Sequence, residues 1–322
     1  MIPGPRTLRR AGVLGINGRN GDYVLRFNPR RLYPLVDDKL KTKRLAEEAG
    51  IAVPRLYGVI RAVHDVRRLP EIVSRHEDFV IKPATGSGGN GILVVTGRMG
   101  DLFRTAGGDL LTLDDLEFHV SNILSGVYSL GGQSDQAMIE YRVRFDPVFE
   151  HISYQGVPDL RIIVFLGVPV MAMVRLPTRG SDGKANLHQG AIGAGIDLAT
   201  GLTGTAVWND LVITVHPDTG ISVTGVEIPG WAELLRLAAC CWELTGLGYQ
   251  GVDLVLDRDL GPLILELNAR PGLNIQIANR AGLRHRLDLV ERHLRRLRTV
   301  ERRVAFAREE LEELAREAAQ SA

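Results

Sequence analysis

The sequence predicts a globular protein that mixes helices and strands, of the α/β or α+β class. Hydrophobic residues make up 45% and charged residues 24% of the 322 residues, which is ordinary for a folded domain. Apolar strands flank short turns at 159–177 and 251–272, and amphipathic helical stretches occur before, between and after these hairpins. A chain of this length predicts two domains, or one domain built of lobes, with a sizeable core.

The composition also excludes several classes of protein. Basic and acidic residues nearly balance, at 39 and 38, so no overall field attracts the chain to nucleic acid or to an acidic membrane. No apolar run approaches the roughly 18 residues of a membrane span, and the N-terminus lacks a signal peptide. The adjacent Cys240 and Cys241 lie in an apolar helical stretch, which indicates buried reduced thiols and a reducing, cytoplasmic compartment.

The first half of the chain predicts an arm at 1–36 followed by alternating helices and strands. The arm is too short for a complete βαβ unit. A helix is predicted at 37–49, because Leu40, Leu45 and Ala49 lie at helical spacing and Gly50 is a stop signal. The elements expected next are a strand at 55–60, a helix at 65–76, a strand, glycine loop and strand at 78–95, a helix at 113–125 and a strand at 136–143.

The second half predicts hairpins around a long polar loop. The expected order is a hairpin at 159–177, a glycine-rich loop at 178–197, a hairpin at 208–225 with its turn at Pro217–Gly220, a helix at 230–245 and a strand pair at 251–272. A polar loop as long as 178–197 is unusual within a compact domain and indicates a functional or mobile segment.

The last segment, 284–319, predicts one long helix. Six of its apolar residues recur with heptad spacing, namely Val300, Val304, Ala307, Leu311, Leu314 and Ala318. Its first half is rich in arginine and its second half in glutamate. Three interpretations are open: the helix packs on its own domain, it pairs with a second copy or a partner subunit, or its basic face binds RNA. The interspersed acidic residues make RNA binding the weakest of the three.

A phosphate-binding loop is predicted after Lys82. This lysine ends an apolar strand, where its charge needs a counter-charge. The next segment offers no carboxylate but four glycines within 86–91, with Ser87 and Asn90 between them, and their backbone N–H groups can surround an anion. The segment lacks the ending of a Walker A loop and the spacing of a dinucleotide-binding loop. The alternative is a glycine hairpin with an exposed lysine.

Hard oxygen ligands gather on the strand pair at 251–272. Asp253 lies on the first strand, while Glu266 and Asn268 are two apart on the second and therefore share a face. Burying such side chains on apolar strands destabilises the fold unless a cation is bound. Together with phosphate oxygens, these oxygen ligands suit Mg²⁺. The alternative is that the carboxylates cap nearby loops.

Further charged residues lie between and beside these two motifs. They are Asp159, Arg161 and Arg175 of the first hairpin, Lys184 and His188 of the long loop, and Arg270 after the last strand. Each alone is a surface charge, but beside a triphosphate and magnesium they can neutralise phosphate or bind a carboxylate substrate.

The order of these motifs resembles the ATP-grasp superfamily. A lysine-bearing helix, a strand with a lysine before a glycine loop, a DxR strand, a basic loop and an Asp strand followed by ExNxRPG occur in this order between Asp37 and Gly282. The segments DDKLKTKRLAEEAG, GSGGNGI, NLHQGA, GVD and ELNARPGL are most similar to RimK-type α-L-glutamate ligases and glutamate ligase homologues. The resemblance implies the α+β ATP-grasp fold, in which two lobes with mainly antiparallel sheets hold ATP. It places these lobes at 37–145 and 146–283.

The resemblance also implies a role for each matching residue. The residues implied to bind ATP are Lys39, Lys82, Ser87, Gly88, Gly89, Asn90 and Gly91 at the phosphates, and Glu140, Tyr141, Arg142 and Val143 as a hinge at the adenine. The ligands implied for two Mg²⁺ ions, with Mn²⁺ as an alternative, are Asp253, Glu266 and Asn268. The residues implied near the γ-phosphate and the acyl intermediate are Arg161, Arg175, Lys184, Asn186 and Arg270. The acid expected to bind ribose is Asp146 or Glu150.

The implied activity is ATP-dependent carboxylate–amine ligation through an acyl-phosphate. The implied substrates are an amino acid, a peptide or a protein terminus, with glutamate as the added residue by resemblance. Two departures from RimK-type ligases bear on the substrate. Only 36 residues precede Asp37, where those ligases have a folded domain, and Arg270 stands where RimK has a small residue. The alternatives are an ATP-binding subunit that needs a partner and an ATP-grasp phosphotransferase.

Overall fold

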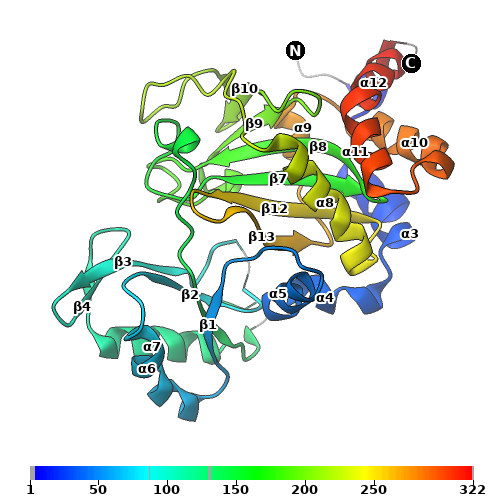
Figure 1. Ribbon diagram of the computed structural model, residues 1–322. Coiled ribbons are helices and arrows are strands. Elements are labelled where there is room, and N and C mark those ends of the chain that lie inside the picture. The colour runs from blue at the N-terminus through cyan, green and yellow to red at the C-terminus, as the bar shows by residue number, and fades with distance from the viewer. Residues whose placement is uncertain (1–3, 87, 130–131, 321–322) are drawn as a thin grey trace.

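The computed structural model describes residues 4–86, 88–129 and 132–320 and shows two lobes, each built on one sheet (Figure 1). All paired strands within both sheets are antiparallel, which confirms the α+β class. Helices α4 (Pro34–Asp37) and α5 (Lys39–Glu48) lie between the two sheets. Among the described helices, none combines the length and the apolar character needed to span a bilayer.

The N-terminal lobe has a six-stranded sheet in the order β1-β6-β2-β3-β4-β5. Its strands are β1 (Leu56–Ile60), β2 (Phe79–Pro83), β3 (Leu93–Met99), β4 (Leu102–Thr105), β5 (Leu110–Leu111) and β6 (Ala137–Glu140). Helices α6 (Leu69–Val73) and α7 (Leu113–Leu124) pack on this sheet, where Leu116 and Ile123 are buried in one cluster with Phe79 and Ile81. Each buried side chain of this kind contributes about 1.5–3 kcal/mol to folding.

Most elements predicted for this lobe are confirmed. The helix at 113–125 is α7, which starts with a capping box between Thr112 and Asp115. The helix expected at 65–76 is instead a 3₁₀ segment (Val63–Arg68) followed by the short α6. Strands β4 and β5 were not predicted, because they are too short to show an alternating pattern.

The C-terminal lobe has a seven-stranded sheet in the order β11-β10-β9-β8-β7-β12-β13. Its strands are β7 (Asp159–Phe165), β8 (Val168–Leu176), β9 (Ile192–Ile196), β10 (Thr203–Trp208), β11 (Leu211–Ile213), β12 (Tyr249–Asp257) and β13 (Gly261–Asn268). The described helices of this lobe include α8 (Trp231–Thr245) and α9 (Ile275–Ala278), and short 3₁₀ segments lie at Pro147–Phe149 and Leu187–Gln189. Strands β8 and β12 are buried along their whole length, so they form the centre of the core.

The two main hairpins are confirmed, and two loop predictions are wrong. The β7–β8 turn at Leu166 and Gly167 has positive φ at both residues, as a two-residue hairpin turn requires. The turn expected at Pro217–Gly220 is flanked by a single isolated bridge, and the paired hairpin is β10–β11, which turns at Asn209 and Asp210. The loop expected at 178–197 ends earlier than predicted, because its small apolar residues from Ile192 onward form β9.

The expected N-terminal arm packs on the C-terminal lobe. Its described elements are α1 (Pro5–Arg10), α2 (Ile16–Gly18), a π-helical segment (Arg19–Val24), α3 (Leu25–Phe27), a 3₁₀ segment (Arg30–Leu32) and α4. The ring of Tyr23 meets Phe165 of β7 edge-on at 5.5 Å between centroids. The amide of Asn28 donates to the backbone oxygens of Tyr249 and Ala269 at 2.6 and 2.9 Å. These contacts join the arm to β7, β12 and the end of β13.

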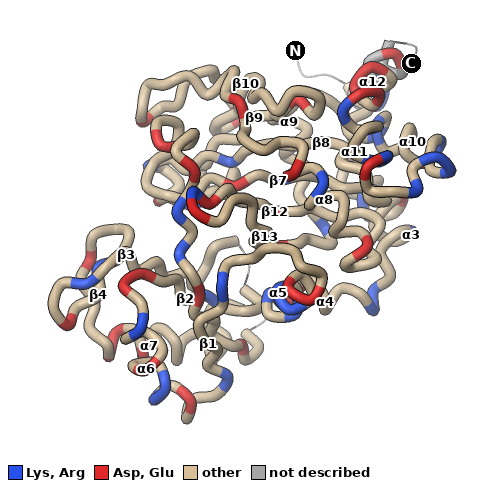
Figure 2. Tube along the Cα trace, viewed as in Figure 1, with Lys and Arg blue, Asp and Glu red and all other residues tan. Residues whose placement is uncertain are grey.

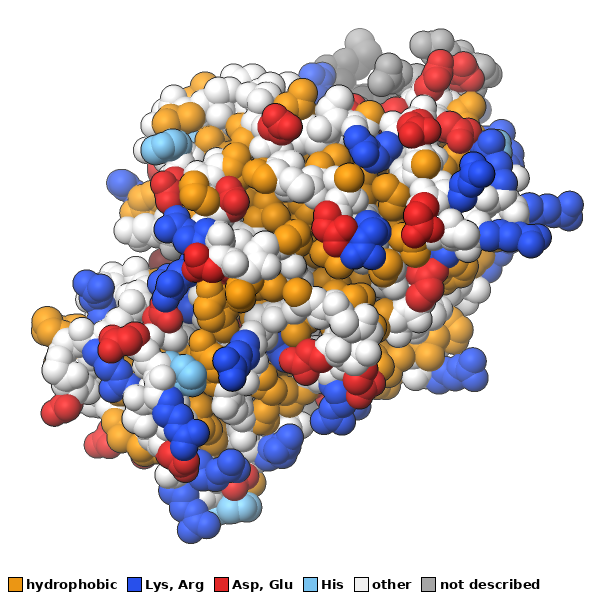
Figure 3. Space-filling model, in the orientation of Figure 1, with side chains coloured by type: hydrophobic (Ala, Val, Ile, Leu, Met, Phe, Trp, Pro, Cys, Tyr) orange, Lys and Arg blue, Asp and Glu red, His pale blue; other side chains and the backbone are white. Residues whose placement is uncertain are grey.

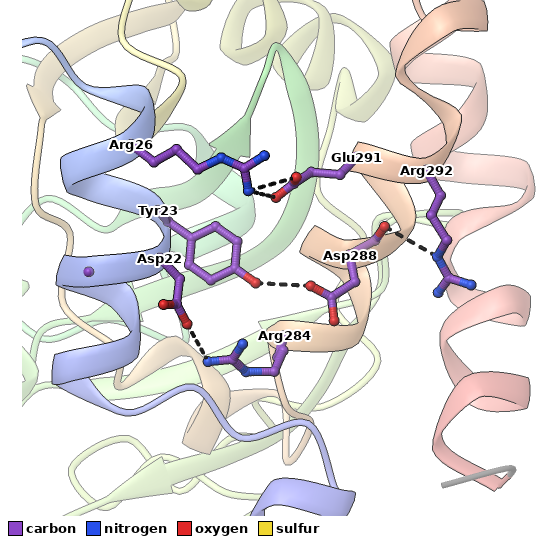
Figure 4. Close-up of a pocket in the computed structure, with 8 residues that line it drawn as sticks. Asp22, Tyr23, Arg26, Arg284, Asp288, Glu291 and Arg292 are labelled. Carbon is purple, nitrogen blue, oxygen red and sulfur yellow. Dashed lines mark hydrogen bonds and ion pairs between the residues drawn. The ribbon is translucent and has the colours of Figure 1, made fainter.

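Three polar pairs also join the arm to α10 (Arg284–His293), as Figure 4 shows. They are Arg26 with Glu291 at 3.0 Å, Arg284 with Asp22 at 2.9 Å, and the Tyr23 hydroxyl with Asp288 at 3.1 Å. They line a pocket of about 620 Å³. These polar groups are already paired with one another, so we interpret the pocket as the place where the arm is attached to α10.

The single long helix expected at 284–319 is wrong. The segment folds as α10, a 3₁₀ turn (Leu294–Arg296), α11 (Val300–Glu309) and α12 (Leu311–Gln320). The break precedes Thr299, whose extended backbone ends the turn and whose hydroxyl caps α11 by accepting from the N–H of Arg302.

The C-terminal helices pack on their own lobe. The arginine-rich part faces the glutamate-rich part within the chain, since Arg286 pairs with Glu312 at 2.7 Å and Arg296 with Glu310 at 2.6 Å. Leu311 is fully buried in the core of the lobe. These contacts support the first of the three interpretations of this segment.

The two cysteines are free thiols on α8, with Cys241 buried and Cys240 half-buried. Burial raises the pKa of both thiols. The prediction of buried thiols is confirmed for Cys241, whereas Cys240 is partly exposed.

Candidate active site

The site begins where α5 crosses between the lobes. Asp38 caps this helix by accepting from the N–H of Leu40, which fixes the first turn and the direction of Lys39. The Lys39 ammonium donates to the backbone oxygen of Gly86 at 2.5 Å, so it lies at the start of the glycine loop. Burial lowers the pKa of Lys39, and the nearby carboxylate of Glu266 opposes this shift. Lys39 therefore connects the loop of one lobe with the acidic strands of the other.

A buried ion-pair cluster lies next to Lys39. Glu140 at the end of β6 pairs with Lys82 of β2 at 2.5 Å and with Lys43 of α5 at 3.0 Å. All three side chains are at most 10% exposed. Burial alone would raise the pKa of Glu140, but the two ammonium groups hold it below its ordinary value. The cluster therefore has two positive charges and one negative charge, next to a fourth charge on Lys39.

Positive charge predominates at this point of the molecule. In Figure 2, basic positions of α5 lie between the two lobes. The outer surface differs, because both signs of charge are interspersed over the face shown in Figure 3 and hydrophobic side chains gather in its middle. A local excess of buried lysine needs an anion to balance it.

The glycine loop supplies backbone groups beside these lysines. Gly88, Gly89 and Gly91 all have positive φ, which other residues rarely adopt. Ser87 lies outside the described residues. The base of the loop is held by Asp135, whose carboxylate accepts from the N–H and hydroxyl of Thr85. Sequence reasoning missed Asp135, which had no motif around it.

The long polar loop of the C-terminal lobe reaches the glycine loop. The side-chain amide of Gln189 donates to the backbone oxygen of Gly88 at 3.2 Å. Lys184 lines a pocket of about 510 Å³ together with Gly89, Asn90, Gly91, Tyr128 and others. Asn186 accepts from the N–H of His188 and so shapes its own turn. The structure thus places Lys184 and Asn186 beside the glycine loop, while their predicted role at the γ-phosphate stays a prediction.

The predicted magnesium ligands lie side by side. Asp253 of β12 is the cross-strand partner of Glu266 on β13, and the Asn268 amide is 3.4 Å from the Asp253 carboxylate. Glu266 is half-buried and, within the described residues, no hydrogen bond or ion pair engages it. No cluster of three His, Cys, Asp or Glu side chains in the described chain could hold a metal. The set has two carboxylates and an amide, which fits Mg²⁺ when phosphate oxygens complete its coordination.

Two arginines also donate to Asp253, and one of its carboxylate oxygens accepts from both of them and from Asn268. Arg161 of β7 donates to both carboxylate oxygens at 2.7 and 2.5 Å, and Arg175 of β8 donates at 2.9 Å. Arg175 also pairs with the buried Asp159. Burial would raise the pKa of Asp253, but the guanidinium groups hold it well below its ordinary value. The network fixes both arginines beside the predicted metal ligands, with their forked N–H edges paired with Asp253 and Asp159.

The expected adenine hinge is partly occupied by the protein itself. The Tyr141 N–H donates to the backbone oxygen of Arg55 at 2.8 Å, so this group faces β1. The Arg142 side chain pairs with Asp78 at 2.9 Å, and Val143 is buried in a small apolar cluster. Adenine binding at the hinge stays a prediction that has to use other backbone groups there.

The remaining predicted residues lie at the margin of the site. Asp146 caps a 3₁₀ turn by accepting from Val148, and Glu150 pairs with Arg258 at 2.6 Å, so both ribose candidates have partners. Arg270 is exposed, and its guanidinium lies 5.2 Å from the ring centroid of Tyr33. The structure therefore does not place Arg270 in the Asp253 network.

The fold and these residues together define an ATP-grasp protein, with two antiparallel sheets, paired lysines at a glycine loop and acidic strands opposite. Residues 18–292 match the family described as sugar-transfer associated ATP-grasp, and the chain belongs to this family. The match begins within the expected arm, in keeping with the packing of that segment. It does not single out RimK-type ligases, so the finer resemblance stays a prediction.

Solved structures similar to this chain include a synthetase and two ligases. The D-cycloserine synthetase DcsG is 18% identical, with 83% of this chain and 73% of that chain covered and a TM-score of 0.47. The ATP-grasp ligase PsnB complexed with a minimal precursor is 17% identical, with 79% and 58% covered and a TM-score of 0.43. D-alanine–D-alanine ligase from Bacillus anthracis with ATP is 12% identical, with 89% and 67% covered and a TM-score of 0.41.

The likeness has clear bounds. This chain spans little more than half the length of PsnB. No curated protein matches the sequence. The low identities and scores do not assign a substrate to this chain.

Proposed function

We propose that this protein is an ATP-dependent carboxylate–amine ligase that forms an amide bond through an acyl-phosphate. The observation that carries the proposal is the buried excess of lysine between the lobes, with Lys39 close to Glu266, a carboxylate that makes no hydrogen bond or ion pair among the described residues. Lysines balance the negative charge of a triphosphate, and a free carboxylate beside an asparagine suits its magnesium. Membership of the ATP-grasp family supports the same nucleotide.

The chain's own residues would position the reactants. Lys39 and Lys82 neutralise phosphate oxygens, and the glycine loop donates backbone N–H groups to them. Magnesium held by Asp253, Glu266 and Asn268 would offset further charge on the phosphates. An acid carboxylate then attacks the γ-phosphorus and releases ADP. The amine attacks the acyl carbon, loses a proton and releases phosphate.

The arginine network belongs to the substrate side of this reaction. Arg161 and Arg175 are fixed by Asp253 and Asp159, so they present oriented guanidinium groups at β7 and β8. Because their Nε and Nη2 groups already donate to these carboxylates, the remaining Nη1 groups would bind the substrate carboxylate and orient it for attack. The acid is an amino acid, a peptide or a protein terminus in this proposal, with glutamate favoured by the RimK resemblance.

The test is ADP release from Mg-ATP with acids and amines offered singly and in pairs, followed by mass analysis of the products. The panel includes amino acids, short peptides, uronic acids and amino sugars, because the family is described as sugar-transfer associated. A product lighter by one water than its two substrates would support the ligase. A phosphorylated acceptor would show a phosphotransferase. ATP binding without turnover on any pair would favour the subunit interpretation.

A further inference from the structure

Lys43 has no assigned role in the site, although it lies at its centre. It follows Lys39 by four residues on α5, so both ammonium groups leave the same face of the helix. The Lys43 side chain is 7% exposed, pairs with Glu140 at 3.0 Å and donates to the backbone oxygen of Pro54. Burying this charge is costly, so its position calls for a specific partner.

Glu140, the partner of Lys43, is also the partner of Lys82, the lysine proposed to contact the phosphates. Glu140 binds Lys82 through one carboxylate oxygen and Lys43 through the other. If Glu140 had only Lys82, the pair would be neutral and Lys82 would be held at the carboxylate. With Lys43 present, the cluster keeps one positive charge, and Glu140 remains neutralised when Lys82 turns toward a phosphate.

We propose that Lys43 is a positioning residue for nucleotide binding, which acts as the second counter-ion of Glu140 and so frees Lys82 to contact nucleotide phosphates. The inference rests on the proposed function for its ligand, an adenine nucleotide. It differs from a purely structural role, in which Lys43 ties α5 to Pro54 and to β6.

The experiment compares four forms of the full chain: wild type, Lys43→Met, Glu140→Gln and the double variant. Methionine has a similar length and no charge, and glutamine keeps the shape of the carboxylate. Affinities for ADP with Mg²⁺ and for adenosine are measured by calorimetry, and thermal unfolding reports the fold. The double variant is decisive, because it restores the single positive charge that Lys43→Met removes.

The expected result depends on the phosphates. Lys43→Met should weaken ADP binding by about tenfold, the scale of one unit charge acting through a partly screened site, and adenosine binding by less than about twofold. The double variant should recover most of the ADP affinity. A structural clamp would weaken ADP and adenosine alike and would not be rescued by Glu140→Gln.

Equal losses for ADP and adenosine, or an unrescued double variant, would overturn the inference. If Lys43→Met does not fold, Glu140→Gln is compared with the double variant, and the inference predicts similar ADP affinities for the two, because Lys43 acts through Glu140. A much weaker ADP affinity in the double variant would overturn it. Failure of the proposed function is a separate result: wild type that binds ADP but forms no amide refutes the ligase and leaves the Lys43 comparison intact.

Discussion

Glu140 shows how far residue-level reasoning reaches in this molecule. Its place at the hinge was expected from a motif, and its backbone was the expected ligand. The structure gives its side chain a different task, since it joins Lys82 and Lys43 in a buried cluster. The glycine-loop motif pointed to Lys82, and the resemblance pointed to Lys39. The sequence did not assign a role to Lys43. Its partner Glu140 lies about a hundred residues further along the chain, and the two meet only when α5 packs against the N-terminal lobe.

The metal set is the best test of the site at this scale. Glu266→Gln should lower Mg²⁺-dependent ATP turnover by roughly 100-fold or more, because it removes one of the two carboxylates of the predicted metal set, and the other, Asp253, is already paired with arginines. Thermal unfolding should be unchanged within about 0.5 kcal/mol, since the side chain is only half-buried. The measurements are ADP release over a magnesium titration and a melting curve.

Glu227→Gln is the matched control, because Glu227 is an exposed glutamate of the same lobe. It should leave turnover and its magnesium dependence as in wild type. A folded Glu266→Gln variant with near-normal turnover would refute the metal assignment.

At the scale of elements, local sequence patterns decided most of the fold. The hairpin of β7 and β8 and the pair of β12 and β13 were predicted because long apolar runs flank short turns. The prediction of one helix at 284–319 was wrong. Heptad spacing describes only the apolar residues, and it gives no sign of the helix cap at Thr299 that interrupts the segment. Strand β9 was missed because Ile192–Ile196 is rich in small residues, and its pairing with β8 is a tertiary effect.

The β7–β8 turn packs against α8 and α11, and a substitution at Gly167 tests this contact. Gly167→Ala should destabilise the protein by about 2–4 kcal/mol, from a left-handed backbone together with a steric clash. The added methyl would press on Arg303 and lie 2.7 Å from the Trp242 ring. Arg303 stacks 4.8 Å from the centroid of that ring and pairs with Glu243. Chemical denaturation measures the loss.

Gly261→Ala is the control that measures the effect of the left-handed backbone without the steric clash. Gly261 also has positive φ at a hairpin turn, but its added methyl meets open space. It should cost only about 1–2 kcal/mol. Equal losses for the two variants would show that the contact with α8 and α11 contributes nothing.

At the scale of the whole molecule, the described part of the N-terminal arm and the helices α11 and α12 belong to the C-terminal lobe. The arm packs Tyr23 on the core aromatics, and α11 and α12 add Phe306 and Leu311 to the same core. No local pattern predicted this arrangement, because each segment buries only a few side chains and needs the finished sheet as its partner. The resemblance to the ATP-grasp superfamily did predict two lobes, each with a mainly antiparallel sheet.

Removal of residues 311–322 tests the packing of the tail. We expect a loss of about 3 kcal/mol in unfolding free energy, from the burial of Leu311 and the pairing of Glu312 with the buried Arg286. Light scattering should show the same number of subunits as in wild type, because these contacts are made within one chain. A smaller assembly after truncation would show that the helix also joins copies.

The account depends most on the claim that this site forms an acyl-phosphate. The direct measurement is trapping with hydroxylamine: the enzyme, Mg-ATP and hydroxylamine are incubated with single carboxylic acids, and hydroxamate and ADP are measured together. The account predicts that one acid gives equal amounts of both products and that Lys82→Met gives neither. ADP release with a stable phosphorylated acceptor and no hydroxamate would contradict it.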